Sequence, residues 1–293
     1  MGHHRWRRTP VLYSALAAIL IISALGSGRA AAQYIITEII DLTGDGVGNF
    51  LFEASGIAVD SAGNAYVAGR FTDNAFKITP AGVVTEVIDA VGDGAGNLLN
   101  GPEGIAVDGT GNAYVTGHLS NNAFKITPAG VITQIIDATG DKTGNGLFIP
   151  TAIAVDAAGN AYVTGAGSDN AFKITPAGAI TEIIDATGDG AGNILNAPVG
   201  IAVDASANAY VAGSTSDNAF KITPAGAITE IIDPTGDGAG NILNAPVGIA
   251  VDGAGNAYVT GAGSDNAFKI TLAGVITEII DSDGDSGQWS YWC

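Results

Sequence analysis

Residues 183–204 read IIDATGDGAGNILNAPVGIAVD, and residues 231–252 repeat them with one change, Ala186 in the first copy and Pro234 in the second. A period of fixed length is typical of solenoids, propellers and other repeat arrays. The sequence therefore predicts one repetitive domain. The phrase Gly-Ile-Ala-Val-Asp marks the period of 48 residues, beginning at Gly56, Gly104, Ala152 (with Ala in place of Gly), Gly200 and Gly248.

Each unit contains four short segments with the residue types of strands. In the third unit they cover residues 152–156, 160–165, 170–175 and 179–185. They are rich in Ile, Val, Tyr, Phe and Thr and have the length of ordinary strands. Gly-Asn and Pro-Ala-Gly turns separate the first from the second and the third from the fourth, because these residues suit the backbone of tight turns. No segment after the N-terminal leader has a sustained helical period, so we predict an all-β protein.

Four antiparallel strands in a unit of roughly 40–50 residues make the blade of a β-propeller. In the third predicted strand of the third unit, Phe172 and Ile174 point to one side and Lys173 to the other. Both sides of the strand carry apolar residues, as blades that pack face to face require. We predict a β-propeller of four-stranded antiparallel blades with five full 48-residue repeats.

One extra N-terminal strand is left over. Residues 35–41 copy the fourth strand of the fifth unit at 275–281, so the fourth strand occurs six times and the others five times. Either a five-bladed ring carries a spare edge strand, or a wider ring is left incomplete and is finished by another chain. An unpaired edge strand invites association. We expect five blades, with the extra strand beside the last blade.

Residues 195–232 resemble the NHL repeat; they read LNAPVGIAVDASANAYVAGSTSDNAFKITPAGAITEII. The usual form of this repeat is a Pro-x-Gly start, a strand that ends in Asp, a Gly-Asn hairpin and an Asn before the third strand. All five units, from Gly56 to about Ile280, carry this pattern, with Ala at single motif positions of the first, third and fourth units. This resemblance to NHL/SBBP-like repeats of secreted proteins implies the propeller fold. It also implies that the loops between units share one face of the disc with the Ser-Asp-Asn loops, such as 168–170. The Phe-Lys-Ile triplet at 172–174 departs from the Arg-Ile pair of many such repeats.

The N-terminus has the three parts of an export signal. A basic start at 5–8 precedes an apolar run at 11–26, and three alanines end at Ala32 as a cleavage site. The apolar run is short for a membrane span of roughly 20 residues, although an uncleaved anchor is the alternative. We predict an exported protein, periplasmic, extracellular or at the cell surface, with no membrane span after cleavage. Its parts are a signal peptide at 1–32, a propeller at 33–281 and a C-terminal tail at 282–293.

The mature chain is strongly acidic. The full sequence has a formal charge of −18, and four of its 11 basic residues precede Gln33, so 7 remain against 29 acidic ones and the charge becomes −22. Such a surface repels nucleic acid and anionic lipid and attracts cations or basic partners. Cys293 is the only cysteine, which excludes an internal disulfide.

The loops between units carry a repeated acidic pattern. Each loop begins with an Asp, a second Asp follows four residues later, and an Asn follows after four more in five of the loops. Calcium prefers about six to eight oxygen ligands, which such loops can supply, but the closing Glu of a calcium loop is missing. Asp, Gly and Asn also serve plain turns. The candidate calcium ligands are Asp89, Asp93, Asn97, Asp137, Asp141, Asp185, Asp189, Asn193, Asp233, Asp237 and Asn241.

Two further patterns concern side chains on and near the blades. One lysine recurs in each unit, usually with an Asp four residues before it, as in Asp169 and Lys173. We expect these residues to form surface ion pairs, each worth under about 1 kcal/mol. The units differ most at positions such as Arg70, His118 and Lys142, where an enzyme would build an asymmetric site. In the sequence these positions form no catalytic set.

Catalytic motifs are otherwise missing from the sequence. His118 is the one histidine after the leader, and no serine pairs with a histidine and no glycine loop leads into a helix. We therefore expect a non-enzymatic binding or scaffold module that acts through its acidic loop face on an unknown protein or carbohydrate partner, and not on nucleic acid. The alternatives are a metal-dependent propeller enzyme of lyase or hydrolase type, and a structural protein that self-associates through an edge strand.

Overall fold

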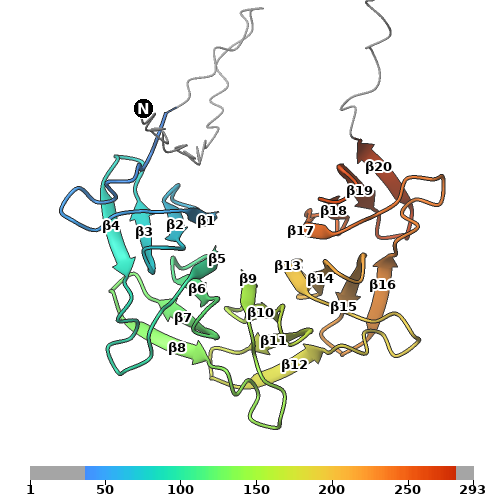
Figure 1. Ribbon diagram of the computed structural model, residues 1–293, viewed down its shortest axis with the longest axis horizontal. Helices are drawn as coiled ribbons and strands as arrows, with labels where there is room; N and C mark the ends of the chain where they lie inside the picture. Colours follow the sequence, from blue (N-terminus) through green and yellow to red (C-terminus); the bar gives the residue numbers. More distant parts are fainter. Residues whose placement is uncertain (1–36, 282–293) are drawn as a thin grey trace, which may run out of the picture.

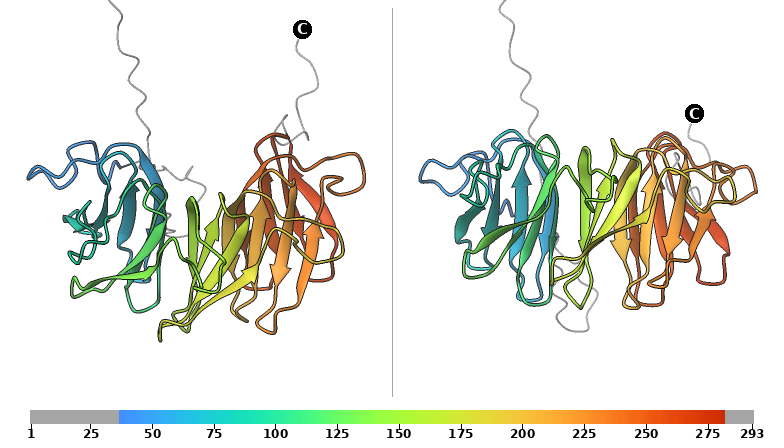
Figure 2. Two further views of the ribbon diagram at one scale, coloured as in Figure 1. Left: turned by 60° about the horizontal axis from the view of Figure 1, so that its bottom comes forward. Right: turned by 90° about the horizontal axis from the view of Figure 1, so that it is seen from below.

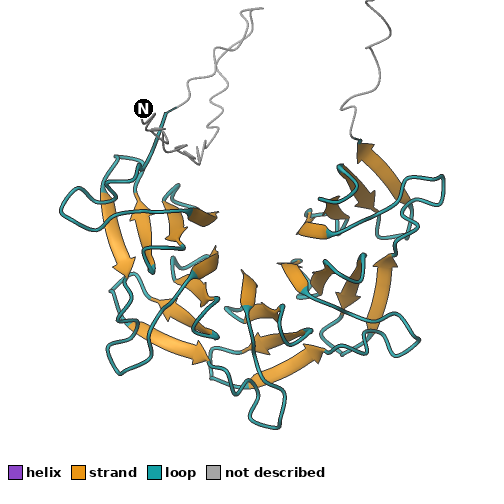
Figure 3. Ribbon diagram, in the orientation of Figure 1, coloured by secondary structure: helices purple, strands orange, loops and turns teal. Residues whose placement is uncertain are grey.

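The computed structural model describes residues 37–281. Within this range the chain consists of strands and loops (Figure 3). These residues contain no helix, and so none that could span a membrane. The predicted signal peptide, the first residues of the extra strand and the predicted tail at 282–293 lie outside the described residues. The all-β prediction is confirmed.

The strands form five antiparallel sheets, each of four strands that follow one another along the chain. We number these sheets as blades 1 to 5. The prediction of five four-stranded repeats is confirmed. Blade 1 contains β1 (Ala54–Val59), β2 (Ala65–Gly69), β3 (Asn74–Ile78) and β4 (Val84–Ile88). Blade 2 contains β5 (Pro102–Val107), β6 (Ala113–Gly117), β7 (Asn122–Ile126) and β8 (Ile132–Ile136). Blade 3 contains β9 (Pro150–Val155), β10 (Ala161–Gly165), β11 (Asn170–Ile174) and β12 (Ile180–Ile184). Blade 4 contains β13 (Pro198–Val203), β14 (Ala209–Gly213), β15 (Asn218–Ile222) and β16 (Ile228–Ile232). Blade 5 contains β17 (Pro246–Val251), β18 (Ala257–Gly261), β19 (Asn266–Ile270) and β20 (Ile276–Ile280).

The blades stand side by side around an arc (Figure 1). The first strand of each blade lies on the inner side of the arc and the fourth on the outer side, and the inner strands of successive blades pack against one another. Seen from the side, the strands run between the two faces of the arc (Figure 2). The arc is open between β1 and β17 (Figure 1). The expected five-bladed ring is therefore wrong: the turn from blade to blade is too small for five blades to complete a circle.

Hydrogen bonds accepted by one Asp hold the hairpin between the first and second strands of each blade. In blade 3, Asp156 accepts hydrogen bonds from the backbone N–H of Asn160 (2.9 Å), the side-chain amide of Asn160 (2.7 Å) and the hydroxyl of Tyr162 (3.0 Å). Gly159 has a positive φ of 78°, which glycine adopts without strain. Asp156 is buried, and its hydrogen bonds compensate for its desolvation. The predicted Asp-Ala-Ala-Gly-Asn hairpin is confirmed.

The hydrophobic core is divided among the interfaces between blades. Between blades 2 and 3, Tyr114 and Ile136 from blade 2 pack against Leu147, Phe172 and Ile174 from blade 3. Equivalent residues form the same cluster between the other neighbouring blades. Burial of such a side chain stabilises the fold by roughly 1.5–3 kcal/mol. Because every internal blade contacts a similar neighbour on each side, the same residues suit every unit.

The extra N-terminal strand is not formed in the described residues. Residues 37–41 lie in no strand, and Ile39 and Ile40 pack against blade 1, in a cluster with Leu51 and Phe76. The prediction that this segment lies beside the last blade as a strand is therefore wrong. The physical reason is that a fourth strand pairs with the third strand of its own blade, and within residues 37–281 no third strand is left to pair with this segment.

The recurring lysine does not form the predicted ion pair. In blade 3, Lys173 lies opposite Tyr162 on the neighbouring strand, and its Nζ is 5.6 Å from the centre of the tyrosine ring. This cation–π contact recurs in every blade. Asp169, the predicted partner, instead accepts a hydrogen bond from the backbone N–H of Ala197 (2.7 Å) and so links blade 3 to blade 4.

Candidate functional site

The acidic loops satisfy their carboxylates internally. In the loop before blade 2, Asp89 accepts a hydrogen bond from the N–H of Val91 (2.9 Å), and Asp93 accepts from the N–H of Ala95 (2.9 Å) and the side-chain amide of Asn97 (2.6 Å). The two acids of a loop therefore close two separate turns. The same bonds recur for the other candidates: Asp137, Asp185 and Asp233 accept from the residue two positions ahead, and Asp141, Asp189 and Asp237 from Asn145, Asn193 and Asn241.

These hydrogen bonds favour the charged carboxylates. The side-chain amide of Asn97 and then the N–H of Ala95 hold the pKa of Asp93 below its usual value. Within residues 37–281, no group of three or more His, Cys, Asp or Glu side chains is placed to hold a metal ion. A carboxylate that accepts one or two N–H groups keeps lone pairs that a cation can use, so calcium binding at these loops stays a prediction.

The implied arrangement of the loops on one face agrees with their contacts. Asn122, which follows the loop between β6 and β7, donates a hydrogen bond from its side chain to the carbonyl of Leu98 in the acidic loop (2.9 Å). The hydroxyl of Ser120 accepts from the N–H of Asn100 (3.1 Å). Equivalent bonds recur in the other blades. The acidic loops and the Ser-Asp-Asn loops thus meet on one face of the arc.

Blades 1 and 2 depart from the repeat on the inner side of this face. Arg70 and His118 occupy the same position, directly after β2 and β6, where blades 3 to 5 carry a small residue. Glu103 lies on β5, where the other inner strands carry Ser, Thr or Val. The ionisable side chains therefore gather where the internal repetition is broken. We call Arg70, Glu103 and His118, together with Glu53, the inner-edge cluster.

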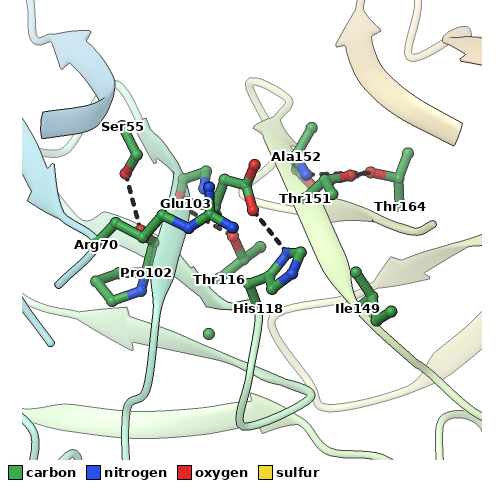
Figure 4. A network of polar contacts seen from close by, with 12 residues as sticks. Ser55, Arg70, Pro102, Glu103, Thr116, His118, Ile149, Thr151, Ala152 and Thr164 are labelled. Carbon is green, nitrogen blue, oxygen red and sulfur yellow. Dashed lines mark hydrogen bonds and ion pairs between the residues drawn. The ribbon is translucent and has the colours of Figure 1, made fainter. Parts of the chain in front are cut away.

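Glu103 and His118 form the closest pair of this cluster. His118 Nδ1 lies 2.6 Å from Glu103 Oε2 as an ion pair (Figure 4). Both atoms are shielded from solvent, and within the described residues neither forms a hydrogen bond of regular geometry. The backbone N–H of His118 donates to the carbonyl of Gly101 (3.0 Å), which fixes the start of the loop. The His118 side chain is 17% exposed, so part of the ring still reaches solvent.

Blade 1 adds a guanidinium and an aromatic pair. Arg70 is among the residues drawn in Figure 4, and its guanidinium lies 4.0 Å from the carboxylate of Glu53. Phe52 precedes Glu53 in the chain and Phe71 follows Arg70. Their rings stack with the centres 6.1 Å apart, and both side chains are exposed. The inner-edge cluster is thus flanked by an apolar surface that can contact a ligand.

The clefts of the described residues lie elsewhere. A groove of about 540 Å³ runs between blades 2 and 3, lined by Tyr114, Lys125, Asp137 and Lys142 among others. A second groove, of about 450 Å³, lies between blades 1 and 2 beside Tyr66 and Lys77. Neither groove includes Glu103 or His118.

The Glu103–His118 pair has the composition of an acid–base dyad. A carboxylate beside one ring nitrogen of a histidine favours a proton on that nitrogen and leaves the other, Nε2, as the acceptor. Such a histidine can take a proton from a bound molecule and return it, and the carboxylate stabilises the imidazolium formed between the two steps. Arg70 supplies a positive charge that can stabilise negative charge on a ligand.

Comparison with known proteins agrees with this architecture. The pattern of the beta-propeller repeat named SBBP matches residues 51–70. The chain is a repeat β-propeller. No sequence among the curated proteins matches the propeller. Among solved structures it is similar to virginiamycin B lyase from Staphylococcus aureus with quinupristin, at 21% identity over 84% of this chain and 74% of that chain with a TM-score of 0.62.

Two further solved propellers show the range of proteins with this fold. One is from a nidogen/laminin complex, at 21% identity over 77% of this propeller and 78% of that chain, with a TM-score of 0.58. The other is a gluconolactonase from Xanthomonas campestris, at 15% identity over 80% of this propeller and 78% of that chain, with a TM-score of 0.55. At these identities the similarity shows the fold alone.

The expectation of a non-enzymatic protein is corrected by these comparisons, because a lyase and a gluconolactonase are among the propellers of similar structure. The expectation also rested on His118 having no partner. The structure places Glu103 beside it, a residue that the sequence analysis missed. The available signal was the repeat itself, since Glu103 replaces the Ser, Thr or Val of the other units and His118 replaces the small residue of blades 3 to 5.

Proposed function

We propose that the propeller acts on a small organic molecule at the inner-edge cluster, with His118 as the group that transfers a proton. The observation that carries the proposal is the Glu103–His118 contact of 2.6 Å, between two shielded atoms with no other partner in the described residues. The lyase and gluconolactonase among the similar solved structures add support at the level of the fold.

In this proposal each residue of the cluster has a separate role. His118 Nε2 takes a proton from the substrate or from a water molecule, and Glu103 orients the ring and stabilises its positive charge. Arg70 binds negative charge that develops on the substrate. The exposed rings of Phe52 and Phe71 contact an apolar part of the substrate. Two reaction classes fit a single base of this kind, the elimination of a carboxylate from an ester and the hydrolysis of a lactone.

The test measures turnover by the purified protein of two groups of compounds: esters that can eliminate a carboxylate, and lactones. We expect His118→Ala to lower the rate by roughly 10²–10⁴-fold. Glu103→Gln should lower it by a smaller factor. Ser214→Ala is the matched control, because Ser214 occupies the position of His118 in blade 4, and its rate should equal that of the wild type. Equal turnover by His118→Ala and the wild type would show that His118 is not the base.

A second candidate function is favoured by the exposed apolar residues on the acidic loops. Leu98, Ile194 and Ile242 occupy equivalent loop positions and are all exposed. Apolar side chains surrounded by carboxylates suit a basic partner that also has apolar groups. We propose that an exported form binds such a partner through this loop face. Titration with a lysine- and leucine-rich amphipathic peptide tests it: Ile194→Ser should weaken binding, and added salt should weaken it further.

A further inference from the structure

The groove between blades 2 and 3 differs in charge from two other grooves of the arc. It runs along the outer strand β8, and its ionisable lining consists of two lysines, Lys125 and Lys142, and one aspartate, Asp137, which sum to +1. The groove between blades 1 and 2 is lined by one lysine and one glutamate, which sum to zero. A third groove, beside β16, is lined by one glutamate and two aspartates, which sum to −3. A positive groove is thus set in a chain with a formal charge of −18.

Two departures from the repeat give the groove this charge. Gln134 lies on β8, where the outer strands of the other four blades carry a glutamate: Glu86, Glu182, Glu230 and Glu278. Lys142 lies in the acidic loop after β8, where four other acidic loops carry a glycine: Gly46, Gly94, Gly190 and Gly238. The first change removes a negative charge and the second adds a positive one. Both residues line the same groove.

The backbone at Lys142 suits glycine better than lysine. Its φ is 64°, near the 71° of Gly94 and the 70° of Gly190 at the same position of other loops. A side chain in this left-handed region costs free energy that glycine does not lose. The stability of the loop alone therefore favours glycine and does not explain the lysine.

Gln134 lacks the hydrogen bond that its counterparts form. In blade 3, the buried side-chain amide of Asn170 donates to Glu182 (2.8 Å), and the equivalent bond is present in blades 1, 4 and 5. In blade 2, Asn122 donates to the carbonyl of Leu98, and no bond joins it to Gln134 within residues 37–281. The half-buried amide of Gln134 therefore keeps both a donor and an acceptor for a molecule in the groove.

The ammonium group of Lys142 is also available. The hydroxyl of Thr139 is the largest cause that holds the pKa of Asp137 below its usual value, and the charge of Lys142 is the smallest. In the described part of the chain, Lys142 forms no ion pair with Asp137 or with any other acid. Neutralisation of Asp137 therefore does not account for Lys142. Lys125 lies over the ring of Tyr114, 5.6 Å from its centre, a contact that leaves N–H donors free.

We propose that this groove binds a polyhydroxylated organic anion, such as a sugar acid or a sugar phosphate. Lys142 and Lys125 supply the positive charge, and Gln134 binds a hydroxyl group without the repulsion of a glutamate. The hydroxyls of Thr127 and Thr175 accept backbone N–H bonds (3.1 Å each) and keep their own hydrogens as donors.

The size of the groove and the screening of charge are consistent with such a ligand. The volume of about 540 Å³ is in the range of small-molecule sites. Acidic side chains farther away than about 8 Å are largely screened at physiological ionic strength, so the lysines of the lining outweigh the net charge of the chain. The proposal does not depend on the inner-edge cluster, because none of its four residues lines the groove.

Calorimetric titration with three compounds of one sugar framework tests the ligand class. The probes are glucuronate, glucose 6-phosphate and uncharged glucose. We expect at least one of the two anions to bind at one site per chain, at least about tenfold more tightly than glucose, and added salt to weaken its binding. The stronger of the two anions shows whether the groove prefers a carboxylate or a phosphate. No binding of either anion at millimolar concentration, or equal binding of glucose, would overturn the proposal.

Two variants locate the site without disturbing the fold, because each restores the residue of the other blades. Lys142→Gly and Gln134→Glu should each weaken anion binding by about tenfold or more, and the thermal midpoint of Lys142→Gly should not fall. Lys125→Gln should weaken binding as well. Its matched control is Lys77→Gln, in the groove between blades 1 and 2, which should bind like the wild type. Unchanged binding in both Lys142→Gly and Gln134→Glu would show that the anion does not occupy this groove.

Discussion

Ile232 and Ile280 occupy the same position in blades 4 and 5 but differ in burial, so the same substitution can be compared at both. Ile232 ends β16 and is buried against Leu243 and Phe268 of blade 5, whereas Ile280 ends β20 at the open end of the arc. Replacement of a buried Ile by Ala removes about 3 kcal/mol, from lost transfer energy and the cavity left behind. At Ile280 only about half of the transfer energy is at stake and no enclosed cavity forms, so the loss is about 1 kcal/mol.

The measurement is urea unfolding of Ile232→Ala and Ile280→Ala at a protein concentration where the chain is monomeric. We expect Ile232→Ala to lower the free energy of unfolding by about 2 kcal/mol more than Ile280→Ala, with the slope against urea unchanged. Equal losses in the two variants would refute the reasoning, because they would mean that the outer face of blade 5 is covered in the monomer.

Three further predictions concern the hydrogen bonds of the blades and loops. Burial opposes ionisation of Asp108, but the bonds from Asn112 and Thr110 prevail and lower its pKa from 3.8 to about 2. Its carboxylate therefore stabilises the fold above the unfolded pKa, and Asp108→Asn should remove roughly 1 kcal/mol at pH 7 after allowance for solvent screening. In acid unfolding curves this difference should shrink from about pH 4 and disappear near pH 2. The buried side-chain amide of Asn218 donates hydrogen bonds to Ile194 O (3.0 Å) and Glu230 Oε1 (2.9 Å). Because both acceptors would lose a donor, Asn218→Ala should lower the free energy of unfolding, measured by urea denaturation, by about 2 kcal/mol. Calcium binding at the loops predicts that millimolar calcium raises the thermal midpoint and that Asp189→Asn reduces the rise; an unchanged midpoint in the wild type would show that these carboxylates only close their turns.

Local features of the blade could be predicted because each depends on residues near one another in the chain. The Asp-x-x-Gly-Asn hairpin and the 48-residue period were enough to place all four strands of a unit. The first strand was placed two residues late, at 152 instead of Pro150, because a shift of register between Val163 and Gly165 lengthens the ladder. The position of Lys173 over Tyr162 also follows from the strand register, once the two strands are paired.

The openness of the arc could not be predicted, since it depends on the angle between packed blades. No single residue or motif of the sequence marks that angle. The Glu103–His118 pair was missed for another reason. The two residues lie 15 positions apart, near paired ends of β5 and β6, where Pro102 pairs with Gly117. A search for several histidines around an axis overlooks a dyad that one hairpin assembles.

The interchangeable interfaces have a consequence for how the length of this protein can change. Because each internal contact joins the same two surfaces, a gene segment encoding 48 residues can be duplicated or deleted in phase without creating a mismatched junction. The nearly identical sequences at 183–204 and 231–252 are what such a recent duplication would leave. A lengthened variant would gain one blade and a narrower opening, so recombination alone could convert an open arc into a closed wheel.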